Sequence, residues 1–278
     1  PKYCVKGEYI MFAETFWFNG HHSDDFGLYI LSLDNFDEDN TVGSNIEFTT
    51  VKSGNSDVDK VVSGKYTESI TTKIQVFKLD SCSEMGEINP RELSNIMRWL
   101  NRKDGFHPFK LIQEDYDDLC FNAMINVTKI KIGNFIRGLE LTITTDKPYV
   151  CTDDITKTFT VTKNQPIILL DDSDEIGYRY CHIQIKLFEA GNLSICNGIE
   201  NRYTVINNCQ QGEIIDMSGD TQIITSSLSS STHSTLYDDF NYAYFRLANT
   251  YENRVNKLTF SLACQITLTY NFIRKVGM

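Results

Sequence analysis

The residues with the most direct chemical potential lie near the N-terminus, where His21-His22 is followed by Asp24-Asp25. Imidazole and carboxylate groups bind metal ions and exchange protons. Adjacent residues on a strand point to opposite faces, so only a turn could direct both imidazoles at one ion. No third ligand follows at a helical spacing. We therefore expect no metal site here, and the sequence predicts none elsewhere.

Clusters of carboxylates offer oxygen ligands that calcium prefers. Three clusters occur, at Asp37-Glu38-Asp39, at Asp115 with Asp117-Asp118, and at Asp171-Asp172 with Asp174-Glu175. An EF-hand loop that started at Asp37 or Asp171 would place Val42 or Ile176 where the loop needs glycine. Solvated loop charge is the better interpretation.

Catalytic motifs are missing from the sequence. There is no G-x-S-x-G nucleophile turn, and Gly64-Lys65 fails as a phosphate loop because Asp59 holds the position of the first glycine and Tyr66 that of Ser or Thr. Two carboxylates would suffice for a glycosidase, but with 37 acidic residues such pairs arise by chance. We predict no enzyme activity, no catalytic residue and no cofactor.

Eight cysteines are spread along the chain, at positions 4, 82, 120, 151, 181, 196, 209 and 264. They contain no C-x-x-C pair, and their spacing matches neither a zinc ribbon nor a small disulfide scaffold. Free cysteine packs as a small apolar residue, so we expect buried thiols.

Hydrophobic alternation with a period of two dominates the chain and predicts a mostly-β fold. It runs from Leu258 to Tyr270, which predicts one long half-buried strand, and shorter stretches appear at 121–127, 139–143 and 181–187.

One segment has helical spacing instead. Asn89 can cap a helix, Pro90 suits its first position and Glu92 completes a capping box. Leu93, Ile96, Met97 and Leu100 then form one apolar face. The sequence predicts a single helix over 90–101, packed on a sheet.

The remaining organisation follows from loops and turns. Lys52–Lys65 is polar and rich in Gly and Ser, and Thr225–Thr235 is nearly all Ser and Thr, so both are predicted to be mobile loops that build no core. We place a domain boundary near Pro148, between an N-terminal domain of residues 1–148 and a C-terminal domain of residues 149–278, whose last strand could return to the first domain.

Charge and hydropathy limit the partners. The net charge is −11, and acidic residues outnumber basic ones on both sides of Pro148, so sequence-specific DNA binding is not expected. Apolar runs such as Ile167–Leu170 are far shorter than the roughly 18 residues of a membrane span. Tyr9–Ala13 is too short for a signal-peptide core, so we expect synthesis in a cytosol.

Aromatic residues of the second half could stack on sugar rings, although core or interface packing is the simpler explanation. They are Tyr178, Tyr180, Tyr237, Phe240, Tyr242, Tyr244 and Phe245.

Residue strings carry a more specific signal than the chemistry. Two strings stand close together near the N-terminus, Thr15-Phe16-Trp17-Phe18-Asn19-Gly20 and Ser23-Asp24-Asp25-Phe26-Gly27-Leu28-Tyr29-Ile30. Together they resemble the opening of the distal tail proteins of long-tailed bacteriophages, where an F-x-F-N-G turn leads into a D-F-G-L strand. Further stretches agree in order with that family: Trp99-Leu100 with the basic turn to Phe109, Leu139 to Tyr149, Asp238 to Arg254, and the final strand to Gly277. Residues 150–210 match weakly.

The resemblance implies two β-sandwich domains, the first with one packed helix and the second galectin-like or similar to a carbohydrate-binding module. It implies a structural protein whose first domain forms a six-membered ring between the tail tube and the tail-associated hub, receptor-binding and baseplate proteins. Such a protein is part of the virion, at the distal end of the tail, and is assembled in the bacterial cytoplasm. Genomic DNA would pass through the ring without specific binding, since six copies at −11 each carry −66 of formal charge.

Two alternatives remain. The C-terminal domain could be a saccharide-binding, lectin-like adsorption module for a host surface glycan, with carbohydrate-binding residues unknown. A wall-degrading glycosidase is the third hypothesis. The sequence does not specify the host, the receptor or the residues of the lumen.

Overall fold

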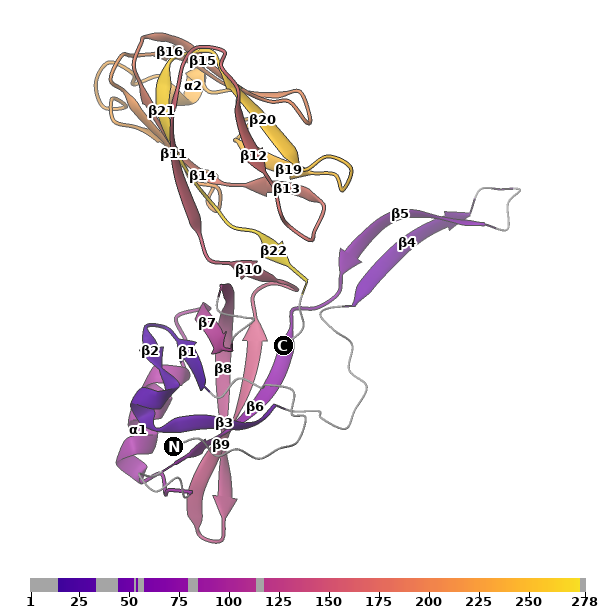
Figure 1. Cartoon of the computed structure of the whole chain (residues 1–278), viewed down its shortest axis with the longest axis vertical. Helices are drawn as coiled ribbons and strands as arrows, with labels where there is room; N and C mark the ends of the chain where they lie inside the picture. The colour runs from indigo at the N-terminus through magenta and orange to yellow at the C-terminus, as the bar shows by residue number, and fades with distance from the viewer. Residues whose placement is uncertain are drawn as a thin grey trace. The chain divides into compact units, whose positions relative to one another are not determined.

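The computed structural model of the chain describes residues 15–33, 45–52, 54, 58–79, 85–113 and 118–275. The chain divides into two compact units, unit 1 with residues 1–151 and 275–278, and unit 2 with residues 152–274. Strands dominate both units (Figure 1), which confirms the predicted mostly-β fold class. No helix of the described residues is long and apolar enough to cross a membrane.

Unit 1 is built on one antiparallel sheet in the order β2-β1-β7-β8-β9-β6-β3. Its strands are β1 (Thr15–Phe18), β2 (His21–His22), β3 (Leu28–Leu33), β6 (Thr71–Lys78), β7 (His107–Ile112), β8 (Leu119–Ile132) and β9 (Phe135–Thr145). The predicted alternation at 121–127 and 139–143 falls on β8 and β9, and its apolar residues face the core, all but Val127 of them fully buried. Strands β1 and β3, near opposite ends of this order, contact each other, so the sheet curls around the core.

The predicted helix is present as α1 (Pro90–Leu100). The Asn89 side chain accepts hydrogen bonds from the backbone N–H groups of Arg91 and Glu92, and the Glu92 carboxylate accepts one from the Asn89 N–H, which confirms the capping box. Leu93, Ile96 and Leu100 are buried and Met97 is half-buried against the same core, as the spacing predicts. The helix thus packs through the face that the sequence indicated.

The predicted mobile loop at Lys52–Lys65 is wrong in large part. Residues 59–65 belong to β5 (Asp59–Tyr66), which pairs antiparallel with β4 (Ile46–Lys52). These two strands pair with each other and with no other strand of the described chain, and Figure 1 shows them as a two-stranded ribbon extending from unit 1. We call this ribbon the arm. Its Gly and Ser residues concealed the alternation on which a strand prediction depends.

Unit 2 contains a five-stranded, a four-stranded and a two-stranded sheet. The first has the order β11 (Ile155–Val161), β21 (Cys264–Tyr270), β14 (His182–Leu187), β17 (Ile214–Met217), β18 (Ile224–Ser226). The second has the order β12 (Ile167–Leu170), β20 (Val255–Phe260), β15 (Gly191–Asn197), β16 (Arg202–Cys209). The third pairs β13 (Gly177–Tyr180) with β19 (Arg246–Asn249), and two short strands, β10 (Val150–Thr152) and β22 (Ile273–Arg274), lie where the chain enters and leaves the unit.

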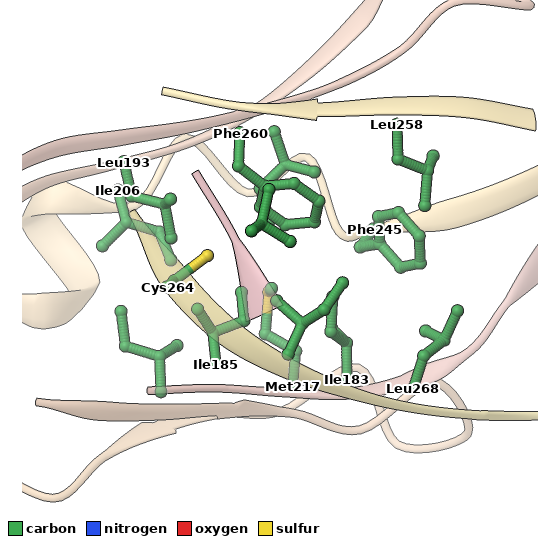
Figure 2. Packing of buried hydrophobic residues seen from close by; sticks show 14 of the residues in the cluster. Ile183, Ile185, Leu193, Ile206, Met217, Phe245, Leu258, Phe260, Cys264 and Leu268 are labelled. Carbon is green, nitrogen blue, oxygen red and sulfur yellow. The ribbon is translucent and has the colours of Figure 1, made fainter. Parts of the chain in front are cut away.

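The core of unit 2 lies between the five-stranded and four-stranded sheets. Figure 2 shows side chains of β20, such as Leu258 and Phe260, directed toward Ile185 of β14 and Cys264 and Leu268 of β21. The single long strand predicted from Leu258 to Tyr270 is therefore wrong, because β20 and β21 belong to different sheets. The alternation itself is correct, since every apolar residue of that series is buried.

The segment 225–235 also differs from the prediction. Residues 225–226 end β18, turns follow, and a one-turn helix α2 (Leu236–Asp239) closes the segment. Ser226 and His233 are buried, so the segment does contribute to the interior. Its Ser and Thr side chains make the turns, and hydrogen bonds rather than apolar contacts hold the two buried residues.

Cys181, Cys209 and Cys264 are free thiols buried in unit 2, which confirms the expectation for these three, whereas Cys120, Cys151 and Cys196 are only half-buried. Cys4 and Cys82 lie outside the described residues. So do Asp37-Glu38-Asp39, Asp115 and Asp117.

Candidate functional site

His21 and His22 serve local structure. The His22 Nδ1 atom accepts a hydrogen bond from the Asp24 N–H at 3.3 Å, and the Asp25 carboxylate accepts one from the His22 N–H at 3.1 Å. Together they cap the short 3-10 helix η1 (Ser23–Phe26). His22, Asp24 and Asp25 thus hold the turn that leads from β2 into β3, while the His21 ring contacts Phe26 and Trp99.

The F-x-F-N-G string packs around a tryptophan of α1. Phe16 and Phe18 are fully buried, and the Trp99 indole N–H donates a hydrogen bond to the Phe18 carbonyl at 2.7 Å. The Trp99 ring stacks on Phe26, with centroids 4.4 Å apart, and on Phe16, with centroids 5.5 Å apart. Asn19 and Gly20 both have positive φ, which the N-G turn between β1 and β2 requires. Two segments of the family resemblance therefore meet in one aromatic stack.

A groove opens beside this stack. It has a volume of about 350 Å³ and is lined by Asn19, His21, Phe26, Asn95, Arg98, Trp99 and Arg102. Two guanidinium groups over an aromatic floor attract anionic groups such as carboxylates. The Arg102 guanidinium is paired with the Asp104 carboxylate. This hydrogen bond, together with a second one from His107, holds the pKa of Asp104 well below its usual range. The groove is a local cationic feature in an acidic chain.

The arm presents two chemically different faces. Directly opposed residues of paired strands point to the same side, so the register places Ile46, Phe48 and Val61 on one face, with exposures of 45%, 59% and 61%. The other face carries Glu47 and Lys65, whose charged groups lie 3.1 Å apart, and an exposed valine, Val51. An apolar face this exposed is typical of a surface that another chain covers.

Two exposed tyrosines of unit 2, Tyr178 and Tyr180, lie beside Arg246. The Arg246 guanidinium lies 3.6 Å from the Tyr178 ring centroid and forms an ion pair with Glu200 at 2.5 Å. Tyr178 is 56% exposed, whereas Phe240 and Phe245 are core residues. The seven aromatics singled out in the sequence thus divide between core and surface.

One group of side chains in the described residues combines three types of metal ligand: Cys209, Glu213 and His233, all buried in unit 2. Glu213 and His233 are 20 positions apart, and their spacing matches no zinc motif. Sequence reasoning missed this group, and the only signal that could have drawn attention to it is the isolated histidine in a Ser/Thr-rich segment.

Two sequence-family profiles match the chain in tandem. One, described as a phage tail protein N-terminal domain, matches residues 11–147, and the other, described as a phage tail C-terminal domain, matches residues 149–270. The chain belongs to a phage tail protein family. No protein in the curated collection of sequences matches this tail protein significantly.

The fold agrees with this assignment. The Dit protein of phage SPP1, whose structure is described as a paradigm of the hub adsorption apparatus in phages that infect Gram-positive bacteria, superposes with a TM-score of 0.65. The match covers 93% of this tail protein and 98% of the SPP1 protein, at 12% sequence identity. The resemblance to distal tail proteins that the sequence indicated is confirmed, and so is the two-part, mostly-β architecture.

Proposed function

We propose that this tail protein is a non-enzymatic hub subunit at the distal end of a phage tail. Six copies form a ring that joins the tail tube to the baseplate or host-adsorption apparatus and lets genomic DNA pass. Its partners are then copies of itself, the tube protein, the tail-associated hub protein and receptor-binding proteins. The protein resides in the virion after assembly in the host cytoplasm. The observation that carries the proposal is the exposed apolar face of the arm.

The arm is suited to contact a neighbouring subunit. Two strands that pair only with each other bury little apolar surface, and an isolated hairpin is marginally stable in water. Covering Ile46, Phe48 and Val61 with a neighbour would remove them from water at about 25 cal/mol per Å² of apolar surface. The edge backbone groups of β4 and β5 would be protected by the same contact. A closed ring needs such a contact between two different patches of the same chain.

The ring-forming surface is assigned to the N-terminal domain, proposed here as residues 1–148, with residues 149–278 forming the outer domain. The arm and the cationic groove both lie in unit 1. The net charge of −11 supports a conduit, because a strongly acidic ring would not retain DNA.

The mass of the purified protein in solution tests the proposal. Light scattering coupled to size-exclusion chromatography should show about six times 31.9 kDa, alone or with the tube and hub proteins. The double variant Phe48→Ser, Val61→Ser should have the mass of the monomer and an unchanged melting temperature. Val51→Ser, on the opposite face of the same arm, is the matched control and should keep the ring. A monomer that also fails to assemble with both neighbours at high concentration would contradict the proposal.

A second function is supported by the tyrosines of unit 2. Tyr178 with Arg246 and Glu200 offers a flat ring beside hydrogen-bonding groups, the combination that binds sugars. We propose saccharide binding by this surface as the alternative role of the C-terminal domain. A glycan array, repeated with Tyr178→Ala, tests it: the signal should be lost with that variant and kept with Tyr251→Ala, which is equally exposed.

A further inference from the structure

A buried polar cluster in unit 2 has no role in the proposed assembly. Cys209 ends β16, Glu213 lies in the turn before β17, and His233 lies in the turns before α2. Their exposed fractions are 1%, 0% and 1%. One ligand atom of each residue lies within 4.8 Å of the ligand atoms of the other two. Thiolate, carboxylate and imidazole are the side-chain groups that bind zinc in proteins.

The imidazole of His233 lies between two carboxylates. Its Nδ1 atom is 2.6 Å from Glu213 Oε1, and its Nε2 atom is 3.5 Å from Asp239 Oδ2. Nε2 has no hydrogen-bond partner among the described residues. A neutral imidazole carries one N–H, so one of its nitrogens must turn a lone pair toward a carboxylate. A metal ion at Nδ1 removes this conflict, because the one proton of the neutral imidazole then lies on Nε2 and faces Asp239.

Cys209 indicates which metal the cluster suits. A set of sulfur, nitrogen and oxygen ligands suits a borderline-soft ion such as Zn²⁺ and does not suit Ca²⁺ or Mg²⁺. Burial raises the pKa of the Cys209 thiol to about 12, with Glu213 and Asp239 adding to the effect. The thiol therefore keeps its proton until a metal ion replaces it, as metals do at thiol ligands.

We propose that Cys209 Sγ, a Glu213 carboxylate oxygen and His233 Nδ1 bind one Zn²⁺ ion as its three protein ligands. His233 stays neutral with its remaining proton on Nε2, directed at Asp239, and the Cys209 proton leaves to solvent. Asp239 then orients the imidazole, as a carboxylate does behind many zinc-bound histidines. The ion would tie the turn between β16 and β17 to the segment before α2.

The local structure needs only a small adjustment. Zinc–ligand bonds of about 2.0–2.3 Å require the ligand atoms to lie roughly 3.3 Å or more apart, so the Glu213 oxygen must move away from Nδ1 by less than about 1 Å. The Gln210 N–H donates to Glu213 Oε2 at 2.7 Å, and the Ser226 hydroxyl donates to Oε1. These two bonds hold the carboxylate in the cluster while it turns.

Cobalt substitution of the full-length chain tests the site. After removal of bound metal with a chelator, Co²⁺ is titrated in and the thiolate-to-cobalt charge-transfer absorption is followed, with Zn²⁺ displacing the cobalt afterwards. We expect saturation at one equivalent per chain and a melting temperature that rises with Zn²⁺. Absence of the charge-transfer band in the wild-type protein would overturn the proposal.

Three variants sharpen the test. Cys209→Ser should remove the band, whereas Cys264→Ser, which alters another fully buried thiol of the same core, should keep it. Asp239→Asn should keep the band and weaken the affinity about 10- to 100-fold, because it removes the charge that orients His233 while the amide oxygen can still accept a hydrogen bond from Asn208 or Thr235. A band that persists in Cys209→Ser would place the ion elsewhere. Should Cys209→Ser not fold, the wild-type spectrum and the Asp239→Asn affinity decide.

Discussion

Units 1 and 2 distribute their aromatic and apolar side chains differently. In unit 1 the rings of Phe16, Trp99 and Phe26 stack on one another, while the arm exposes Ile46, Phe48 and Val61 on one face. In unit 2 the core is mostly aliphatic, and tyrosines such as Tyr178 and Tyr242 remain on the surface. The stack fixes α1 and the N-G turn of unit 1 together, next to the cationic groove. Unit 2 instead encloses the cluster of Cys209, Glu213 and His233.

The two units thus differ in what they expose. Unit 1 exposes an apolar face on the arm, whereas unit 2 encloses an aliphatic core between two sheets. Each unit has its own core cluster, and the two clusters share no residue. Core substitutions should therefore act on one unit at a time.

The largest effect is expected from Phe260→Ala. Phe260 is fully buried in the core of unit 2, so truncating its side chain should cost about 3–5 kcal/mol of unfolding free energy. Hydrogen-exchange mass spectrometry should show loss of protection in β14, β20 and β21 and none in β8 or β9. Tyr242→Ala, a change at a 63% exposed ring, should have little effect. Equal loss of protection in both units would mean that they unfold as one.

Leu100→Ala is the corresponding change in unit 1. Leu100 is fully buried, and removal of its side chain should cost about 2–5 kcal/mol. The loss of protection should be confined to α1 and the strands of unit 1. If the unfolding midpoint stayed constant while the oligomer mass changed, this face of α1 would be an interface and the comparison of two closed cores would fail.

The sequence predicts the residues of these cores well because the spacing of apolar residues along a strand or helix indicates which side chains are buried. The alternation from Leu258 to Tyr270 correctly names the inward-facing residues, although the chain crosses from one sheet to the other between Phe260 and Cys264. In both strands the even-numbered side chains point into the same core, so the alternation continues through the connection between them. Periodicity therefore cannot reveal the change of sheet.

The surfaces and clusters are less visible in the sequence for a related reason. The arm depends on cross-strand pairing between Ile46 and Tyr66, and its apolar residues are interrupted by Ser63 and Gly64. The cluster of Cys209, Glu213 and His233 depends on a contact between residues 20 positions apart. Neither contact has a local signature, so both had to come from the structure, whereas the helix cap at Asn89 is local and was predicted correctly.

That cap provides a smaller test of unit 1. Asn89→Ala removes the acceptor of two backbone hydrogen bonds and should cost about 1 kcal/mol of unfolding free energy. Asn95→Ala, within the same helix, is the matched control and should be neutral or slightly stabilising because alanine has the higher helix propensity. Thermal unfolding followed by circular dichroism measures both. Equal melting temperatures for the two variants would show that packing alone holds α1.

The smallest effect concerns an ion pair that joins α1 to β6. The Lys78 ammonium lies 2.7 Å from the Glu92 carboxylate oxygens, and this hydrogen bond holds the pKa of Glu92 below its ordinary value. Because the folded-state pKa is lowered, the pair stabilises unit 1 above the ordinary pKa of glutamate and loses this contribution as the pH falls through the lowered value. Lys78→Met should therefore lower the melting temperature near neutral pH and have no such effect once Glu92 is protonated.

Lys73→Met is the control. The Lys73 ammonium lies 3.7 Å from the Glu140 carboxylate and is more loosely held, so this change should affect the melting temperature less at every pH. A pH-independent loss in Lys78→Met would assign its effect to the aliphatic stem of Lys78 and to its bond with the Glu87 carbonyl, and not to the charge pair.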